Sequence, residues 1–444
     1  MNKRNVFLIQ KIDTRVFEMI GNEIHNFARE LWPINRSITG EGLRETLRRI
    51  SKHLTKLEIK SVPSGTQVFD WTVPKEWNVK NAYIITPDGK KICDFLENNL
   101  HLVGYSVPFE GRLSLDELKK HLYTLPDNPK AIPYVTSYYK EVWGFCLTQE
   151  QFDTLENGIY EIVINSTLFN GELNYGELFI KGKSDKEIFL STYICHPSMA
   201  NNELSGPTVV TFLAKWLQEL KETDYSYRII FIPETIGSIT YLSRNYKDMK
   251  NKIFAGFNVS CVGDNRVYSY VPSRNGKTIS DLIAKHVLKC TDPNFIEYSW
   301  LNKGSDERQY CAPGIDLPIA SILRSKYAEY PEYHTSLDDL ENVVTPQGLN
   351  GGYWIIRKAI EAIEKNKKYK VTVLCEPQMN KRGIYSNSRK KIKFKKFKLM
   401  LDFISLCDGE SSLLEIAERL NVPIWDLYDI VNELKHHNLI KTTE

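Results

Sequence analysis

The chain has 444 residues, which exceeds the size at which one hydrophobic core usually keeps growing, so two or three domains are expected. Hydrophobic residues make up 42% of the chain and charged residues 25%, proportions typical of a folded globular protein. The net charge of +3 is too small to imply nucleic acid or an anionic membrane as an obligatory partner, and no apolar run approaches the ~20 residues of a membrane span.

The cysteine pattern and the N-terminus point to a compartment. The eight cysteines are scattered and include no Cys-x-x-Cys pair, which favours reduced thiols over disulfides. The apolar run Val6–Ile9 is too short for the core of a signal peptide. We therefore expect a cytoplasmic protein.

Two regions precede the main fold. Residues 1–56 carry an apolar stripe at helical spacing that stops at Trp32–Pro33, and a second helix is predicted after the loop of residues 35–42. Residues 57–165 change to short strand-like runs, prolines and turn signals such as Pro87–Asp88–Gly89. This second stretch is interpreted as an inserted, mostly β domain.

Residues 166–380 alternate between strands and helices. A helix is predicted to open at Gly206 and Pro207, and such alternation favours a mostly parallel sheet covered by helices, that is, an α/β fold. The predicted strands are residues 187–195, 227–233, 255–261, 266–270 and 317–323.

Residues 386–444 form a last unit that follows the basic run Arg389–Lys398. Three short helices are predicted, at 397–406, 413–420 and 424–435, followed by the start of a strand, which is typical of a winged helix-turn-helix. The third helix carries Asp426, Asp429 and Glu433, and these acidic side chains would repel phosphates. DNA is therefore an unlikely partner, and a protein contact or a homo-oligomer is favoured.

Four metal-binding or acid–base side chains each follow an apolar strand of the α/β region. In open α/β sheets, ligands bind beyond the carboxyl ends of the strands, so these side chains are expected to meet at one edge. A hydrolytic zinc site needs imidazoles and carboxylates that converge, with a general base nearby. The four residues are His196, Glu234, Asp264 and His334.

The order of these motifs resembles the zinc-dependent exopeptidases of the M28 aminopeptidase superfamily. More closely, the chain resembles the bacterial aminopeptidase-like proteins of polysaccharide-biosynthesis loci, which join a peptidase-like domain to an inserted β domain and a C-terminal winged helix. The stretches that carry the resemblance are Asn35–Gly40, Trp143–Cys146, Cys195–Ser198, Asn201–Gly206 and Tyr333–Asp338.

The resemblance implies a role for each of the four residues. His196, Asp264 and His334 match zinc ligands, and Glu234 matches the general base that takes a proton from water. A zinc-dependent hydrolase that cleaves a peptide or an amide is implied, with a peptide N-terminus or an amidated sugar as substrate.

Two residues depart from the family pattern. Asn202 stands where a bridging aspartate is usual, and Thr235 stands where a ligand glutamate follows the base. Because an amide and a hydroxyl bring no negative charge, one zinc is favoured over two. We expect it on His196, Asp264 and a third nearby group such as Asn202 or Glu203, with His334 binding metal or substrate. The same departures motivate an alternative, a non-catalytic binding protein on a degenerate peptidase scaffold.

Three further polar residues are candidates for binding substrate. Asp306 and Arg308 lie in a loop that the resemblance places at the cleft, although a solvated loop is an equal interpretation. Arg274 follows a strand in a turn and is a candidate for binding an anion. The aromatic pair Tyr138–Tyr139 could stack on a sugar ring, but a structural role in the β domain is favoured.

Overall fold

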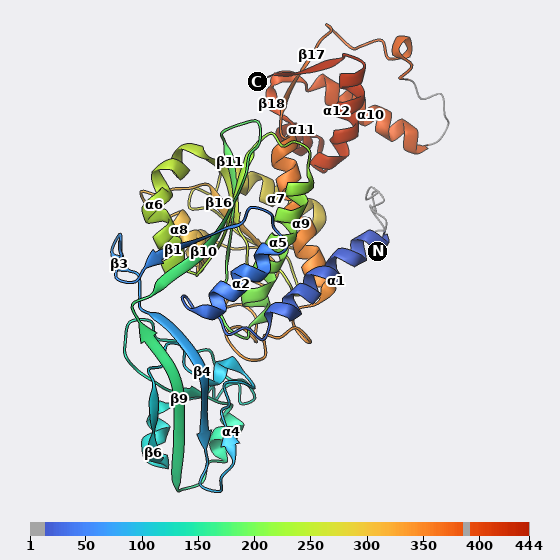
Figure 1. Cartoon of the computed structure of the whole chain (residues 1–444). Coiled ribbons are helices and arrows are strands. Elements are labelled where there is room, and N and C mark those ends of the chain that lie inside the picture. Colours follow the sequence, from blue (N-terminus) through green and yellow to red (C-terminus); the bar gives the residue numbers. More distant parts are fainter. Residues whose placement is uncertain (1–13, 385–390, 444) are drawn as a thin grey trace. The chain divides into compact units, whose positions relative to one another are not determined.

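A computed structural model describes residues 14–384 and 391–443 of the chain (Figure 1). The predictions for Val6–Ile9 and for Arg389 and Lys390 of the basic run therefore fall outside the described residues. By internal packing the chain divides into two compact units, each described by itself below. The first contains residues 1–280 and 296–354, and the second contains residues 281–295 and 355–444. The four-part division of the sequence stays a prediction.

In the described part of the first unit, eight strands form one sheet in the order β1-β10-β12-β11-β13-β16-β14-β15. Neighbouring strands from β12 to β16 are parallel, while β1, β10 and β14 introduce antiparallel pairs. The predicted α/β fold with a mostly parallel sheet is confirmed. The strands are β1 Glu58–Pro63, β10 Glu172–Ile180, β11 Glu187–Tyr193, β12 Ser226–Ile232, β13 Ile253–Asn258, β14 Ser269–Val271, β15 Ile296–Glu297 and β16 Ile319–Leu323.

The central strands β11 and β12 are buried at every position, which explains their nearly continuous apolar sequences. The sequence-based prediction extended two strands by two or three residues, to 195 and 261, whereas β11 ends at Tyr193 and β13 at Asn258. Ile194 and Val259 still donate one backbone hydrogen bond each to a neighbouring strand, and the chain then enters the loops at the carboxyl edge of the sheet.

Helices cover the sheet (Figure 1). Helix α5 buries Val209, Phe212, Leu213 and Leu217, as its spacing predicted, whereas Leu220 lies beyond the helix and is exposed. Phe27 of α1 packs near Phe212 of α5, with ring centroids 6.4 Å apart. The helices are α1 Thr14–Leu31, α2 Glu41–Ser51, α5 Ser205–Glu219, α6 Ile236–Lys252 and α8 Glu307–Tyr310.

The inserted region builds its own antiparallel sheet, in the order β5-β4-β9-β6. The long strands β4 and β9 lie side by side as an antiparallel pair whose register shifts once, between Val79 and Asn81 (Figure 1). The region also contains the two-stranded pairs β2–β3 and β7–β8. Its elements are β2 Gln67–Val68, β3 Trp71–Thr72, β4 Glu76–Ile85, β5 Lys91–Ile92, β6 Phe109–Ser114, α3 Leu115–Leu118, β7 Leu122–Tyr123, β8 Phe145–Cys146, α4 Gln149–Asp153 and β9 Ile159–Phe169.

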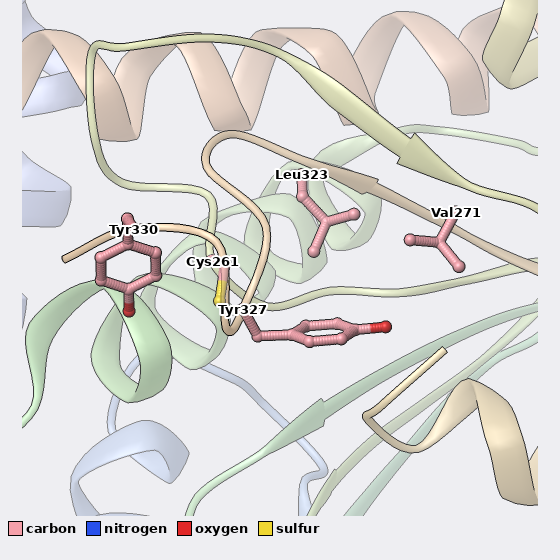
Figure 2. Packing of buried hydrophobic residues seen from close by; sticks show 5 residues of the cluster. All are labelled: Cys261, Val271, Leu323, Tyr327 and Tyr330. Atoms are coloured by element: carbon pink, nitrogen blue, oxygen red, sulfur yellow. The ribbon is translucent and has the colours of Figure 1, made fainter. Parts of the chain in front are cut away.

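A buried cluster supports the loops at the carboxyl edge of the sheet. Figure 2 shows Cys261, Val271, Leu323, Tyr327 and Tyr330, which come from the turn after β13, from β14, and from β16 and the loop beyond it. All five are at most 5% exposed. The cluster therefore ties together three segments that carry or flank the predicted site residues.

The second unit contains a winged helix-turn-helix, as predicted. Ser412 begins α11 with a complete capping box, in which its hydroxyl accepts from the Glu415 amide and Glu415 accepts from the Ser412 amide. The predicted third helix divides into a short 3₁₀ turn, Ile424–Leu427, and α12. The elements are α7 (Ile279–Thr291) from residue 281 on, α9 (Pro346–Lys365) from residue 355 on, β17 Lys368–Val371, α10 Lys391–Ser405, β18 Asp408–Ser412, α11 Leu413–Leu420, α12 Tyr428–His436 and β19 Ile440–Thr443. Within residues 14–384 and 391–443, no helix has both the length and the apolar character needed to cross a membrane.

Candidate active site

The candidate site is built around His196, three residues beyond β11. Its Nδ1 lies 2.9 Å from Oε2 of Glu203, and both side chains are almost completely buried. Behind them, Arg36 donates from Nε to the His196 carbonyl at 3.1 Å and lies 3.6 Å from Oε1 of Glu203. The imidazole is thus oriented by a buried carboxylate, which is itself paired with a buried guanidinium.

Burial lowers the pKa of His196, but the neighbouring Cys195 and Glu203 outweigh burial and hold it well above the ordinary value. Burial also raises the pKa of Cys195 to about 11, so this thiol is uncharged at neutral pH. The charge that favours a proton on His196 near neutrality therefore belongs to Glu203.

Glu203 lies in a single π-helical turn, Ala200–Leu204, that precedes α5. Asp338 caps this turn, because its carboxylate accepts from the backbone amides of Asn201 at 2.7 Å and Asn202 at 2.9 Å. Burial raises the pKa of Asp338 to about 6. π-turns inside helices frequently occur at functional sites, and this one turns Glu203 toward His196.

On its other side, His196 faces Glu234 at the end of β12. The Nε2 of His196 lies 3.6 Å from Oε2 of Glu234, and Ser305 Oγ donates to Oε1 at 2.9 Å. Burial raises the pKa of Glu234, although its side chain keeps 21% of its surface exposed. A carboxylate with a raised pKa that remains reachable from solvent is suited to accept a proton from water.

Asp306 and Arg308, expected to bind substrate, support the turn that carries Glu234. Asp306 accepts from the Thr235 amide at 2.8 Å and from Ser238 Oγ at 2.7 Å, and Arg308 donates to Thr235 Oγ1 at 2.5 Å. Thr235 has a positive φ of 62°, which is costly for a β-branched residue and needs such support. Their contact with substrate stays a prediction.

His334 lies in the same neighbourhood. Its ring centroid is 5.6 Å from that of His196, and Tyr134 of the inserted region packs against both rings at 5.2 and 5.3 Å. Burial, and then the charge of His196, lower the pKa of His334 to about 3. His334 is consequently a neutral imidazole at physiological pH, the state that a metal ligand requires.

Asp264 is engaged by hydrogen bonds from two loops. Its Oδ1 accepts from the Arg266 amide and Ser325 Oγ, and its Oδ2 accepts from Asn201 Nδ2 and the Ser325 amide, at 2.8–3.1 Å. Both oxygens thus have two donors each, so Asp264 holds these loops together. Its role as a zinc ligand stays a prediction.

Asn202 and Arg274 are also engaged elsewhere. The side-chain oxygen of Asn202 accepts from Tyr193 OH at 3.0 Å. Arg274 pairs with Asp316 and donates to the Cys311 carbonyl, so it braces its own loop. Neither residue adds a charged group beside His196.

Among the described His, Cys, Asp and Glu side chains, the group whose ligand atoms all lie within 4.8 Å of one another is Cys195, His196 and Glu203. This group surrounds Nδ1 of His196, where Arg36 already neutralises Glu203. The positive charge of the Arg36 guanidinium would repel a cation bound there. The side of Nε2, which faces Glu234, is therefore better suited to a metal.

Arg36 and Tyr134 belong to the site and were not among the predicted site residues. Arg36, which pairs with Glu203, lies in the stretch Asn35–Gly40 that carries the family resemblance, so the sequence held one signal for it. Tyr134 had none, since nothing in a short aromatic run of the inserted region indicates that it reaches the carboxyl edge of another sheet.

Two protein families match successive parts of the chain. The family described as "Domain of unknown function (DUF4910)" matches residues 25–366, and a winged helix-turn-helix family matches residues 367–442. A Clostridium acetobutylicum protein is 48% identical over 400 residues, covering 89% of this chain and 91% of its own; its provisional name is polysaccharide biosynthesis protein with aminopeptidase-like domain.

Solved structures extend the comparison. A crystal structure from Clostridium acetobutylicum, provisionally described as a peptidase, is 44% identical with a TM-score of 0.90 and covers 97% of this chain and 98% of its own. A zinc aminopeptidase from Bacillus subtilis is 14% identical with a TM-score of 0.57, covering 78% of this chain and 96% of its own. At that identity the likeness concerns the fold alone.

Proposed function

The chain belongs to the family defined by the domain of unknown function DUF4910, carrying a winged helix-turn-helix, and from this premise we propose that it is a zinc-dependent hydrolase of aminopeptidase type. The observation that carries the proposal is the arrangement of His196 between two carboxylates. Glu203 fixes Nδ1, and Glu234 faces Nε2 at 3.6 Å.

The residues around Nε2 fit a zinc ion. Nε2 of His196 is the ring nitrogen left for a metal, because Glu203 engages Nδ1, and imidazole nitrogen is a preferred zinc ligand. A second imidazole, His334, is neutral and lies nearby. Glu203 on Nδ1 is the kind of outer partner that orients a ligating histidine. We propose His196 and His334 as ligands of a single zinc.

Zinc at this place would supply Lewis-acid polarisation of a carbonyl and lower the pKa of water. Glu234 accepts a proton from the attacking water at a carboxylate oxygen as the new C–O bond forms. When the C–N bond breaks, the same carboxyl group returns that proton to the leaving amine. Ser305 holds Oε1 of Glu234 and leaves Oε2 directed toward His196.

The substitution Glu234→Gln tests the role of the base. We expect it to keep the zinc content of the purified protein and to abolish hydrolysis of a panel of aminoacyl 4-nitroanilides and N-acylated amino sugars. Glu329→Gln, at a side chain 46% exposed, serves as the matched control and should retain turnover. Loss of zinc together with turnover would make Glu234 a ligand, and retained turnover would remove it from the mechanism.

The cellular setting is part of the proposal. The relative's name supports a link to polysaccharide biosynthesis, with an amidated sugar or a peptide as substrate. All eight cysteines are free thiols, which supports a reducing cytoplasm. For the winged helix we propose a protein contact or self-association, because exposed Asp429 and the nearby Glu433 would repel DNA phosphates.

A binding protein on a degenerate peptidase scaffold is the second candidate. It is favoured by Asn202 and Thr235, whose neutral side chains are engaged by Tyr193 and Arg308. Zinc analysis of protein prepared in zinc-replete medium separates the two candidates. A stoichiometric ion supports the hydrolase, and a metal-free protein supports the binding scaffold.

A further inference from the structure

The inserted region supplies one wall of the candidate active site through an extended segment, residues 131–138. On one side, the Tyr134 amide donates to the His334 carbonyl at 2.9 Å, and the Ser336 amide donates to the Ile132 carbonyl at 3.0 Å. On the other side, Gly104 exchanges backbone hydrogen bonds with Val135 and Ser137. Because both edges are paired, the segment is held rigidly against the loop that carries His334.

Alternate side chains of an extended segment point the same way, and here Tyr134, Thr136 and Tyr138 share one side. All three line a small cavity that also touches Arg36 and Pro197, next to His196. Tyr134 is the inner end of this row, in contact with both imidazoles. The row leads outward from the site to Tyr138.

Tyr138 also lines a second, larger cavity of about 190 Å³. Its other aromatic walls are Tyr105 and Tyr139, and Ser137 adds a hydroxyl. Lys75 and Glu141 line it too and form an exposed ion pair at 3.3 Å. The walls therefore combine flat rings with hydroxyl and charged groups, and the only aliphatic side chains among them are Pro74 and Leu168.

The exposed ring of Tyr139 in this cavity is fixed by its own hydrogen bond and by the ring of Trp71, which lies beside it outside the cavity lining. Tyr139 is 53% exposed, yet its hydroxyl donates to the Thr72 carbonyl at 2.8 Å. Trp71, 42% exposed, lies with its ring centroid 6.2 Å from that of Tyr139. Exposed rings held by such contacts lose little conformational entropy on binding, which makes them a preformed stacking surface.

We propose that this cavity is a saccharide subsite that binds a pyranose ring of the substrate. The inference rests on the proposed hydrolase and assigns its substrate class, an amide carried on a sugar. A pyranose presents an apolar face of C–H groups, which suits the rings of Tyr138 and Tyr139, and a rim of hydroxyls, which suits Ser137, Lys75 and Glu141. The row from Tyr138 to Tyr134 then leads the amide toward His196.

Binding to the full-length protein tests the subsite. N-acetylglucosamine and its β-1,4-linked dimer are the probes, trialanine amide is the peptide comparison, and saturation-transfer NMR with calorimetry is the readout. We expect the dimer to bind, and Tyr139→Ala and Trp71→Ala each to weaken its binding by about 3- to 10-fold. Phe179→Ala, which removes a comparably exposed ring (48%) from β10, should leave binding unchanged.

Three outcomes would overturn the subsite: no saccharide binding to the wild type, equal binding by all variants, or loss of only the peptide's binding in Tyr139→Ala. The Glu234→Gln variant separates this proposal from the hydrolase. Saccharide binding that persists in Glu234→Gln, together with unimpaired turnover there, would refute the catalytic role and leave the subsite standing. Loss of turnover in Glu234→Gln, with no saccharide binding to either the wild type or the variant, would support the catalytic role and refute the subsite.

Discussion

The substitution Glu203→Gln probes how the candidate site is held together. Glu203 and Arg36 are both fully buried, and their closest atoms are 3.6 Å apart. A glutamine could still accept from Nδ1 of His196, but it would leave the Arg36 charge without a counter-charge in the interior. Breaking one partner of a buried ion pair costs about 3–5 kcal/mol, so the free energy of unfolding should fall by that amount.

Two assays follow from this reasoning. Urea unfolding should show the loss for Glu203→Gln, while Glu30→Gln, which breaks an exposed pair with Arg49, should cost less than about 1 kcal/mol. Zinc affinity should fall about 10- to 100-fold, as expected when the partner of a ligating histidine is removed. In the double variant Arg36→Met/Glu203→Gln, the two losses should be less than additive. A loss below 1 kcal/mol with unchanged zinc affinity would refute the buried-pair argument.

Two further predictions concern carboxylates near the site. Asp264→Asn should lower the free energy of unfolding by at least about 2 kcal/mol, because two of the four donors to Asp264 would face an amide NH₂. The amount of zinc bound per folded molecule should not change, and loss of zinc would make Asp264 a ligand. Asp338 has a folded pKa of about 6 against 3.8 unfolded, so the native state binds more protons in this window and stability falls as pH rises through it. The stability advantage of the wild type over Asp338→Asn in urea should therefore shrink by up to about 3 kcal/mol between pH 3.8 and 6, and an advantage that grows with pH would contradict this.

The parts of the fold that depend on local pattern could be predicted from the sequence. Buried parallel strands are apolar throughout, so β11 and β12 were located within about two residues. The helix predicted at 413–420 coincides with α11, which Ser412 caps. The ends of the strands were less predictable, because the apolar sequence continues past the last strand residue into the loops of the site.

The composition of the site was predictable only in part. His196 and Glu234 follow the ends of β11 and β12 within three residues, and the topology of the sheet brings such residues together. His334 instead lies well beyond the end of β16 at Leu323, in a long loop that returns to the site. The hydrogen bonds that Asp264 accepts from Asn201 and Ser325, both far away in the chain, have no sequence pattern that predicts them.

The balance of charge around His196 argues for a single divalent ion. Two carboxylates lie at the imidazole, Glu203 and Glu234, and Arg36 compensates the first of them. Burial raises the pKa of Asp306 to about 8, so at neutral pH it brings little negative charge. Two zinc ions would bring four positive charges to an imidazole with two carboxylates, one of which Arg36 already compensates. One ion held by His196 and His334, with Glu234 beside it as the base, leaves a much smaller excess of positive charge.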